Sequence, residues 1–156
     1  MSYICFYVSI LTVWIAFAIC SRLKTIDLRH IFIGAVSAVY SLTFDILFGE
    51  YFSLYHYISP EISAIYILMA GILLYPVLNI IYILFLPAKT KPGLIYTTIW
   101  IAAMLFYEYI SLKTETIFFT GWEPVPWSII TYIFTYLWLN VLYKYLNAKY
   151  SRKGVK

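Results

Sequence analysis

The sequence predicts an all-α membrane protein, a polytopic bundle of five transmembrane helices with its N-terminus outside and its C-terminus inside. Hydrophobic residues make up 63% of the 156 residues and charged residues only 12%. Soluble domains have about 45–50% apolar and about 25% charged residues. A soluble monomer of this length has too small an interior to bury so much apolar side chain. Two further observations support this class: five long apolar segments and a one-sided distribution of Lys and Arg.

Five apolar segments are each long enough to cross a bilayer, which takes about 20 residues within a range of about 17–25. In chain order they cover residues 1–21, 31–48, 62–86, 94–112 and 127–143. The first has no charge before Arg22, the second contains only Asp45, and the fourth contains only Glu108. The third is the longest; it contains Pro76 and is stopped by Pro87. None alternates apolar and polar residues at every second position, as barrel strands do, so helices are expected.

The loops between these segments indicate the orientation. Ten of the eleven Lys and Arg fall in the first loop, the third loop and the tail, and only Lys113 falls on the other side. Because loops rich in Lys and Arg stay in the cytoplasm, the N-terminus is predicted to lie outside and the C-terminus inside. Residues 1–145 are predicted to form one transmembrane domain, and residues 146–156 a basic cytoplasmic tail. The alternative is a first segment that is a signal cleaved near Ala18. It is disfavoured because Arg22 and Lys24 follow the apolar run instead of preceding it.

Several functional classes lack their signatures in this chain. The sequence contains no phosphate-binding loop, no H-E-x-x-H and no C-x-x-C. Its only histidines are His30 and His56, and its two cysteines, Cys5 and Cys20, lie on one predicted helix about 22 Å apart. We therefore expect no disulfide, cofactor, resident metal or nucleic-acid partner, and the lipid bilayer is the expected surrounding.

The acidic residues indicate one polar site near the outer face. Six of the seven lie in or near the predicted outer half, and Asp45 and Glu108 stand three and four residues before the ends of their segments. A rise of about 1.5 Å per residue puts both about 5–6 Å below the outer boundary, so their side chains could meet. On the second segment, a stripe of Gly34, Ser37 and Ser41 leads to Asp45 and is expected to face the bundle.

Asp45 and Glu108 are the main candidate residues because a charged side chain costs about 2.5–3.5 kcal/mol at the centre of a transmembrane helix. They could carry a proton, bind a cation, or act as acid and base. The candidate ligand or ion site also includes Asn79, Glu50 and His56. Two alternatives stay open: the acids could be hydrated interfacial groups bonded to tyrosine or lysine, or they could hold a metal ion together with Glu50 and His56.

Two other segments have alternative interpretations. Pro76 and Asn79 lie within the third segment; a simple kink is expected there, although a broken helix could free carbonyls that line a cavity. Residues 51–57 read Tyr-Phe-Ser-Leu-Tyr-His-Tyr and are interpreted as an interfacial hairpin. The alternative is a lid over the acidic site.

Short motifs in the second to fourth segments and in the loop after them resemble those of a known family. They are Phe44-Asp45, Tyr75-Pro76-x-x-Asn79, Phe106-x-Glu108-x-Ile110-Ser111-x-Lys113-Thr114 and Gly121-Trp122. Across residues 28–145 the chain resembles an uncharacterised family of small multi-spanning membrane proteins found mainly in spore-forming Gram-positive bacteria. The resemblance implies a bacterial cytoplasmic membrane, supports Asp45, Pro76, Asn79 and Glu108 as positions to test, and implies no activity. The family usually has Gly after Lys113-Thr114, where this chain has Glu115. The resemblance therefore does not predict the turn in the fourth loop.

Two functions of different classes are open for this site. The favoured one is a non-enzymatic accessory or transport-related component that works with a protein partner or as a homo-oligomer. Five helices are few for a complete alternating-access carrier, which often uses inverted repeats. The alternative is an intramembrane enzyme that acts on a lipid or isoprenoid with Asp45 and Glu108 as acid and base. No specific catalytic signature supports this alternative.

Overall fold

The structure, a computed structural model, describes residues 2–153, with side chains described up to residue 150. Within that range the chain is helical apart from loops and two short strands, and five helical segments are long and apolar enough to cross a membrane. The predicted helical class and the five apolar segments are thereby confirmed. The helices are α1 (Ser2–Leu23), α2 (Leu28–Asp45), α3 (Ser63–Met69), α4 (Tyr75–Phe85), α5 (Thr90–Lys113) and α6 (Ile129–Lys153).

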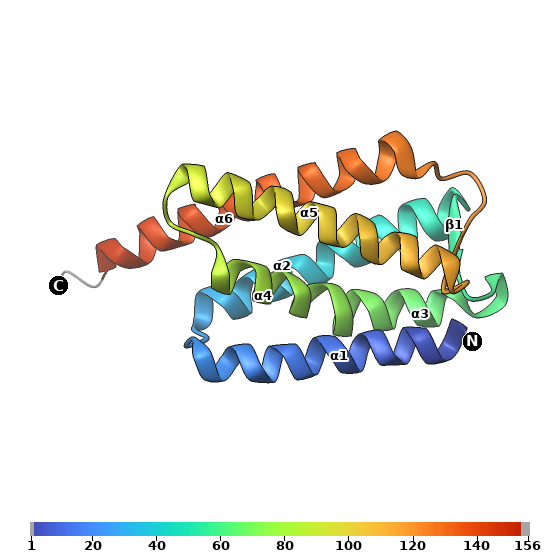
Figure 1. The fold of residues 1–156 in the computed structure, drawn as a ribbon, viewed down its shortest axis with the longest axis horizontal. Helices are drawn as coiled ribbons and strands as arrows, with labels where there is room; N and C mark the ends of the chain where they lie inside the picture. The colour runs from blue at the N-terminus through green and yellow to red at the C-terminus, as the bar shows by residue number, and fades with distance from the viewer. Residues whose placement is uncertain (1, 154–156) are drawn as a thin grey trace.

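The helices run roughly along one axis, and the start of α1 and the end of α6 lie at opposite ends of the bundle (Figure 1). The α4 helix packs mainly against α2 and also contacts α1. The α6 helix contacts α2, α4 and α5, and α6 is the main packing partner of α5. Two clusters of buried side chains result, one around Phe6 and Tyr66 and the other around Tyr82 and Leu139.

Small residues allow α2 to lie close to the third segment. A Cβ atom added at Gly34 would lie 2.7 Å from Cδ1 of Ile80, so a larger side chain here would displace the Ile80 side chain on α4. Ser37 is buried one turn further along, and the hydroxyl of Ser41 donates to the carbonyl of Gly71 at 3.4 Å. The small-residue stripe on α2 therefore faces the bundle, as expected from the sequence, and leads to the buried Asp45.

The third segment is continuous but changes its helical geometry ahead of Pro76. A π-helical turn, Ala70–Leu74, joins α3 to α4. Proline has no N–H to donate and its ring crowds the carbonyl four residues earlier, so the preceding turn widens. The indole N–H of Trp14 donates to the carbonyl of Leu73 at 3.0 Å. This hydrogen bond connects α1 to the third segment.

The α5 helix ends in a turn that requires a left-handed residue. The N–H of Thr116 donates to the carbonyl of Ser111 at 2.8 Å, and the N–H of Glu115 donates to the carbonyl of Leu112 at 3.2 Å. These two bonds form a Schellman motif, whose left-handed position is usually glycine. Here Glu115 occupies that position with φ of 57°. A residue with a side chain therefore adopts a left-handed conformation that favours glycine.

Glu115→Gly is expected to raise the free energy of unfolding by about 1 kcal/mol, because glycine adopts the left-handed conformation without a steric penalty. Thermal unfolding of the protein in detergent, followed by circular dichroism, measures the change. Glu115→Ala is the matched control, since it removes the same charge but keeps the Cβ atom. A gain as large in the alanine variant would show that charge, and not backbone strain, is responsible.

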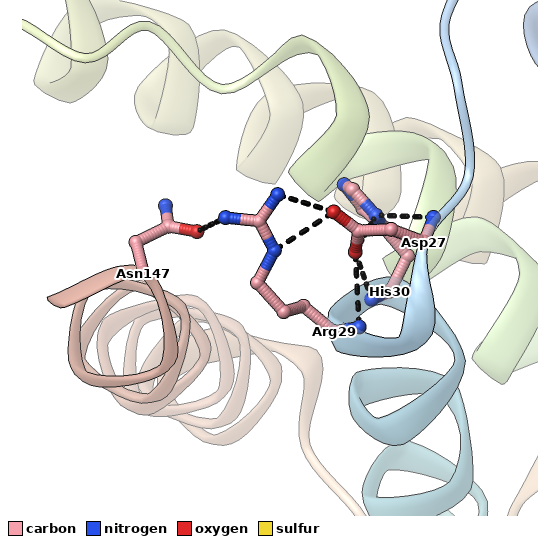
Figure 2. Close-up of polar contacts among 4 residues, drawn as sticks. All are labelled: Asp27, Arg29, His30 and Asn147. Atoms are coloured by element: carbon pink, nitrogen blue, oxygen red, sulfur yellow. Dashed lines mark hydrogen bonds and ion pairs between the residues drawn. The ribbon is translucent and has the colours of Figure 1, made fainter. Parts of the chain in front are cut away.

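At the other end of the bundle, a polar cluster fastens the start of α2 to α6 (Figure 2). Asp27 caps α2 by accepting from the N–H of Arg29 at 2.9 Å, and its carboxylate also binds the Arg29 guanidinium. Arg29 reaches across to Oδ1 of Asn147 on α6 at 2.6 Å. The α6 helix accordingly continues past the predicted end of the fifth span at residue 143, through residues 146–153 of the predicted tail. Residues 154–156 lie outside the described residues.

Asp27→Ala is expected to lower the free energy of unfolding by about 1–2 kcal/mol at pH 7, because it removes both the helix cap and a partly exposed ion pair. The hydrogen bond from Arg29 lowers the pKa of Asp27 from 3.8 to about 2. A carboxylate with a lowered pKa stabilises the fold above its ordinary pKa, and this contribution is lost as the pH falls from about 4 toward about 2. Thermal melts of wild type and variant should therefore converge over that range.

Asp27→Asn is the matched control because asparagine also caps helices well but cannot form the ion pair with Arg29. It should lose less stability than Asp27→Ala at pH 7. A wild-type advantage over both variants that stays constant down to pH of about 2 would contradict this account of the ion pair.

Candidate functional site

The two long loops at the N-terminal end of the bundle pair with each other. Strand β1 (Tyr55–Tyr57) follows a π-helical extension of α2, Ile46–Tyr51, and strand β2 (Ile117–Phe119) follows α5. The strands are antiparallel, with Tyr55 opposite Phe119 and His56 opposite Phe118. Residues 51–57 therefore form no hairpin of their own, and that interpretation is wrong. The strand that pairs with β1 comes from the loop after α5, so residues 51–57 need no turn that folds them back on themselves. We call β1 and β2 together the lid.

Beneath the lid is a cavity of about 120 Å³. Side chains of α2, α4, α5, α6 and both strands line it, and Asp45, Asn79 and Glu108 are among them. Successive side chains on a strand point to opposite faces, so Tyr55 and Tyr57 face inward and are buried while His56 between them is not. The structure thus brings three of the five sequence-derived site residues to one cavity, which the lid covers.

Asp45 is buried in the wall of this cavity with only one oxygen bonded. The phenol of Tyr55 donates to its Oδ1 at 2.6 Å. Its Oδ2 is buried without a hydrogen-bond partner among the described residues, and the residue is only 6% exposed. Burial and then the nearby carboxylate raise the pKa of Tyr55 above its ordinary value, so the phenol keeps the proton that it donates. A buried carboxylate oxygen without a donor is costly, so this atom is available to a ligand.

Glu108 faces the same cavity but is held differently. The hydroxyl of Ser128 donates to its Oε1 at 2.6 Å, and the phenol of Tyr132 donates to its Oε2 at 2.9 Å. The indole N–H of Trp122 in turn donates to Ser128 at 2.9 Å. Both carboxylate oxygens therefore have a donor from α6 or from the π-helical turn before it, Pro124–Ser128. This network fixes the carboxylate in one position, so it can act as a stationary negative charge.

Further tyrosines complete the polar wall around Asn79. The phenols of Tyr57 and Tyr75 lie 2.8 Å apart, which connects the lid to α4. Asn79 is buried one turn after Tyr75 and also lines the cavity. Burial, then the charge of Asp45, raise the pKa of Tyr57 well above its ordinary value. The tyrosines beside the acids therefore act as neutral hydrogen-bonding groups.

Glu50 and His56 lie outside the cavity. Glu50 is exposed on the π-helical extension of α2, and His56 stacks on Phe118 with ring centroids 5.1 Å apart. The alternation of β1 turns His56 to the opposite face from Tyr55. Among the described residues, no group of three or more His, Cys, Asp and Glu side chains could hold a metal ion, so the four-residue metal alternative is not assembled.

Sequence reasoning missed the residues that fix the two acids. Tyr55, Ser128 and Trp122 each lie in or beside a loop whose path the sequence does not determine. One available signal was the alternation in Tyr55-His56-Tyr57, which is that of a strand with one buried face. No protein-family model, curated protein or solved structure gives a significant match to this chain.

Proposed function

We propose that this chain is a multi-pass protein of a bacterial cytoplasmic membrane, with the N-terminus and the lid outside and the C-terminus inside. Five apolar helical segments of sufficient length support the membrane location, and the Lys and Arg of the first loop, third loop and tail support the orientation. The bacterial assignment rests on the resemblance carried by the motifs around Asp45, Asn79 and Glu108.

Within that membrane, the protein is proposed to be a non-enzymatic binding or transport-related component whose cavity takes a small ligand from the outer side. The observation that carries this proposal is the buried Oδ2 of Asp45, which has no hydrogen-bond partner in the described part of the chain, in a cavity that Glu108 also lines. Unpaired buried charge is expensive, and intramembrane acids commonly mark ligand or ion sites. With five helices, the protein would work with a protein partner or as a homo-oligomer.

An intramembrane enzyme with Asp45 and Glu108 as acid and base is less well supported. A general acid or base must exchange a proton with its substrate across a short hydrogen bond. Both oxygens of Glu108 are already occupied by Ser128 and Tyr132. This arrangement suits a fixed charge better than a proton-transferring group.

Native mass spectrometry of gently solubilised protein tests the proposed function. Wild type is compared with an Asp45→Asn, Glu108→Gln double variant and with a control that carries Glu50→Gln and Glu123→Gln, two exposed acids that do not line the cavity. We expect a small-molecule adduct on wild type and control that is absent from the folded double variant. The same adducts on all three proteins, or bare masses throughout, would contradict a ligand site at these acids.

A further inference from the structure

The charged side chains that line the cavity are all acidic. Asp45 and Glu108 both line it, and none of its lining residues is Lys, Arg or His. In the described part of the chain, the salt bridges are those of Asp27 with Arg29 and His30 at the other end of the bundle. Lys113, the last residue of α5, lies over the ring of Tyr109 at 5.6 Å. The two cavity carboxylates therefore have no cationic partner among the described residues.

Aromatic rings form the wall beside Asp45. Phe44 and Trp122 pack edge to face with ring centroids 5.9 Å apart, and Tyr55 packs against Trp122 in the same way at 5.9 Å. Phe119 of the lid adds a fourth ring, 6.2 Å from that of Tyr55. Each of the four rings lines the cavity. The negative face of an aromatic ring attracts cations, and quaternary or substituted ammonium groups are well suited to such a wall.

We propose that the cavity binds a small organic ammonium ion, with its charge near Asp45 and Glu108 and its methyl or methylene groups against the rings of Phe44, Tyr55 and Trp122. This inference rests on the proposed function and adds the chemical class of the ligand. The unpartnered Oδ2 of Asp45 accepts a hydrogen bond from an N–H group or lies against the charged methyl groups of a quaternary ammonium. Glu108, held by two donors, supplies the second charge.

The size and donor set of the cavity favour an organic cation over the other classes. Its volume of about 120 Å³ is close to that of an engineered protein cavity of about 150 Å³ that admits benzene, so a ligand of a few heavy atoms fits. Calcium needs about 6–8 oxygen ligands in a mostly polar shell, whereas four aromatic rings occupy this wall. An anion would meet two carboxylates and no basic side chain among the lining residues.

Isothermal titration calorimetry of the full chain in lipid nanodiscs tests this inference. The probes are choline, tetramethylammonium and 3,3-dimethylbutan-1-ol, the last being an uncharged molecule with the shape of choline. We expect saturable binding of choline or tetramethylammonium, and binding of the alcohol weaker by about tenfold or more because it lacks the charge. Potassium chloride at equal ionic strength should not compete.

Variants separate the acids from the rings. Asp45→Asn is expected to weaken choline binding by about tenfold or more, while Glu123→Gln, an exposed acid outside the cavity, leaves it unchanged. Phe44→Leu keeps an apolar wall but removes a ring, so it should weaken choline binding several-fold without affecting the alcohol. This variant keeps the test decisive if Asp45→Asn does not fold.

Three results would overturn the ammonium inference: equal binding of choline and the alcohol, competition by potassium at equal ionic strength, or no saturable binding of either ammonium probe. If the acid-dependent adduct is nevertheless seen by mass spectrometry, the site is a ligand site for another class of molecule and the proposed function stands. If that adduct is absent as well, both the proposed function and the ammonium inference fail.

Discussion

Tyr82→Ala is expected to lower the free energy of unfolding by about 3–5 kcal/mol, the usual cost of truncating a large buried aromatic side chain. Tyr82 on α4 is 0% exposed and lies at the meeting point of three helices. Its hydroxyl donates to Oδ1 of Asn140 on α6 at 2.8 Å and lies 2.7 Å from Oγ1 of Thr97 on α5. Its ring also packs on Tyr136, with centroids 4.6 Å apart. Thermal or denaturant unfolding in detergent measures the loss.

The matched variant Tyr82→Phe keeps the ring and removes only the hydroxyl. Oδ1 of Asn140 then loses its donor, so a loss of about 1–3 kcal/mol is expected. The alanine variant should be clearly less stable than the phenylalanine variant, because it also leaves a cavity between α4, α5 and α6. Equal stability of the two variants would mean that the ring is not packed as described.

Tyr55→Phe is expected to lower the free energy of unfolding by about 1–3 kcal/mol and to loosen the lid, because neither oxygen of the buried Asp45 then has a donor among residues 2–153. Hydrogen exchange of the backbone in β1 and β2 should become faster in the variant, since local opening of the lid costs less free energy. Exchange measured by mass spectrometry on peptides from residues 52–60 and 115–122 provides the readout.

Tyr51→Phe is the control for this prediction. Tyr51 lies at the end of the π-helical extension of α2, four residues before Tyr55, and is 77% exposed, so loss of its hydroxyl should change stability by less than about 0.5 kcal/mol. If the two variants behave alike, the hydrogen bond from Tyr55 to Asp45 does not hold the lid.

The sequence was sufficient to predict the helical segments because each apolar run is longer than a bilayer requires. It also predicted that the stripe ending at Asp45 faces inward, since Gly34, Ser37 and Ser41 recur on one side of a helix. It did not predict that α6 continues to Lys153. Hydropathy ends at the first charges, whereas a helix continues until a capping or breaking residue, and residues 144–153 include no Gly or Pro.

The parts of the site that sequence analysis missed depend on contacts between distant loops. Tyr55 and Phe119 are paired across the whole of the third and fourth segments, and no local pattern encodes that register. The same pairing decides that Tyr55 faces the cavity and His56 faces away. The sequence pattern pointed to Asp45 and Glu108, which line one cavity, but it could not identify the donors that distinguish the two acids.

The loop after α2 and the loop after α5 pair as a lid above the cavity that Asp45 and Glu108 line. Disulfide trapping tests this pairing most directly, with His56→Cys and Phe118→Cys introduced together after Cys5→Ala and Cys20→Ala. Directly opposed residues on antiparallel strands have Cα atoms about 4.5–5.5 Å apart, a separation that a disulfide bridges. The control pair is His56→Cys with Lys91→Cys, which lies at the far end of α5. Mild oxidation should cross-link the first pair rapidly within one chain and leave the control uncross-linked; no cross-link between the first pair in folded protein would contradict the lid.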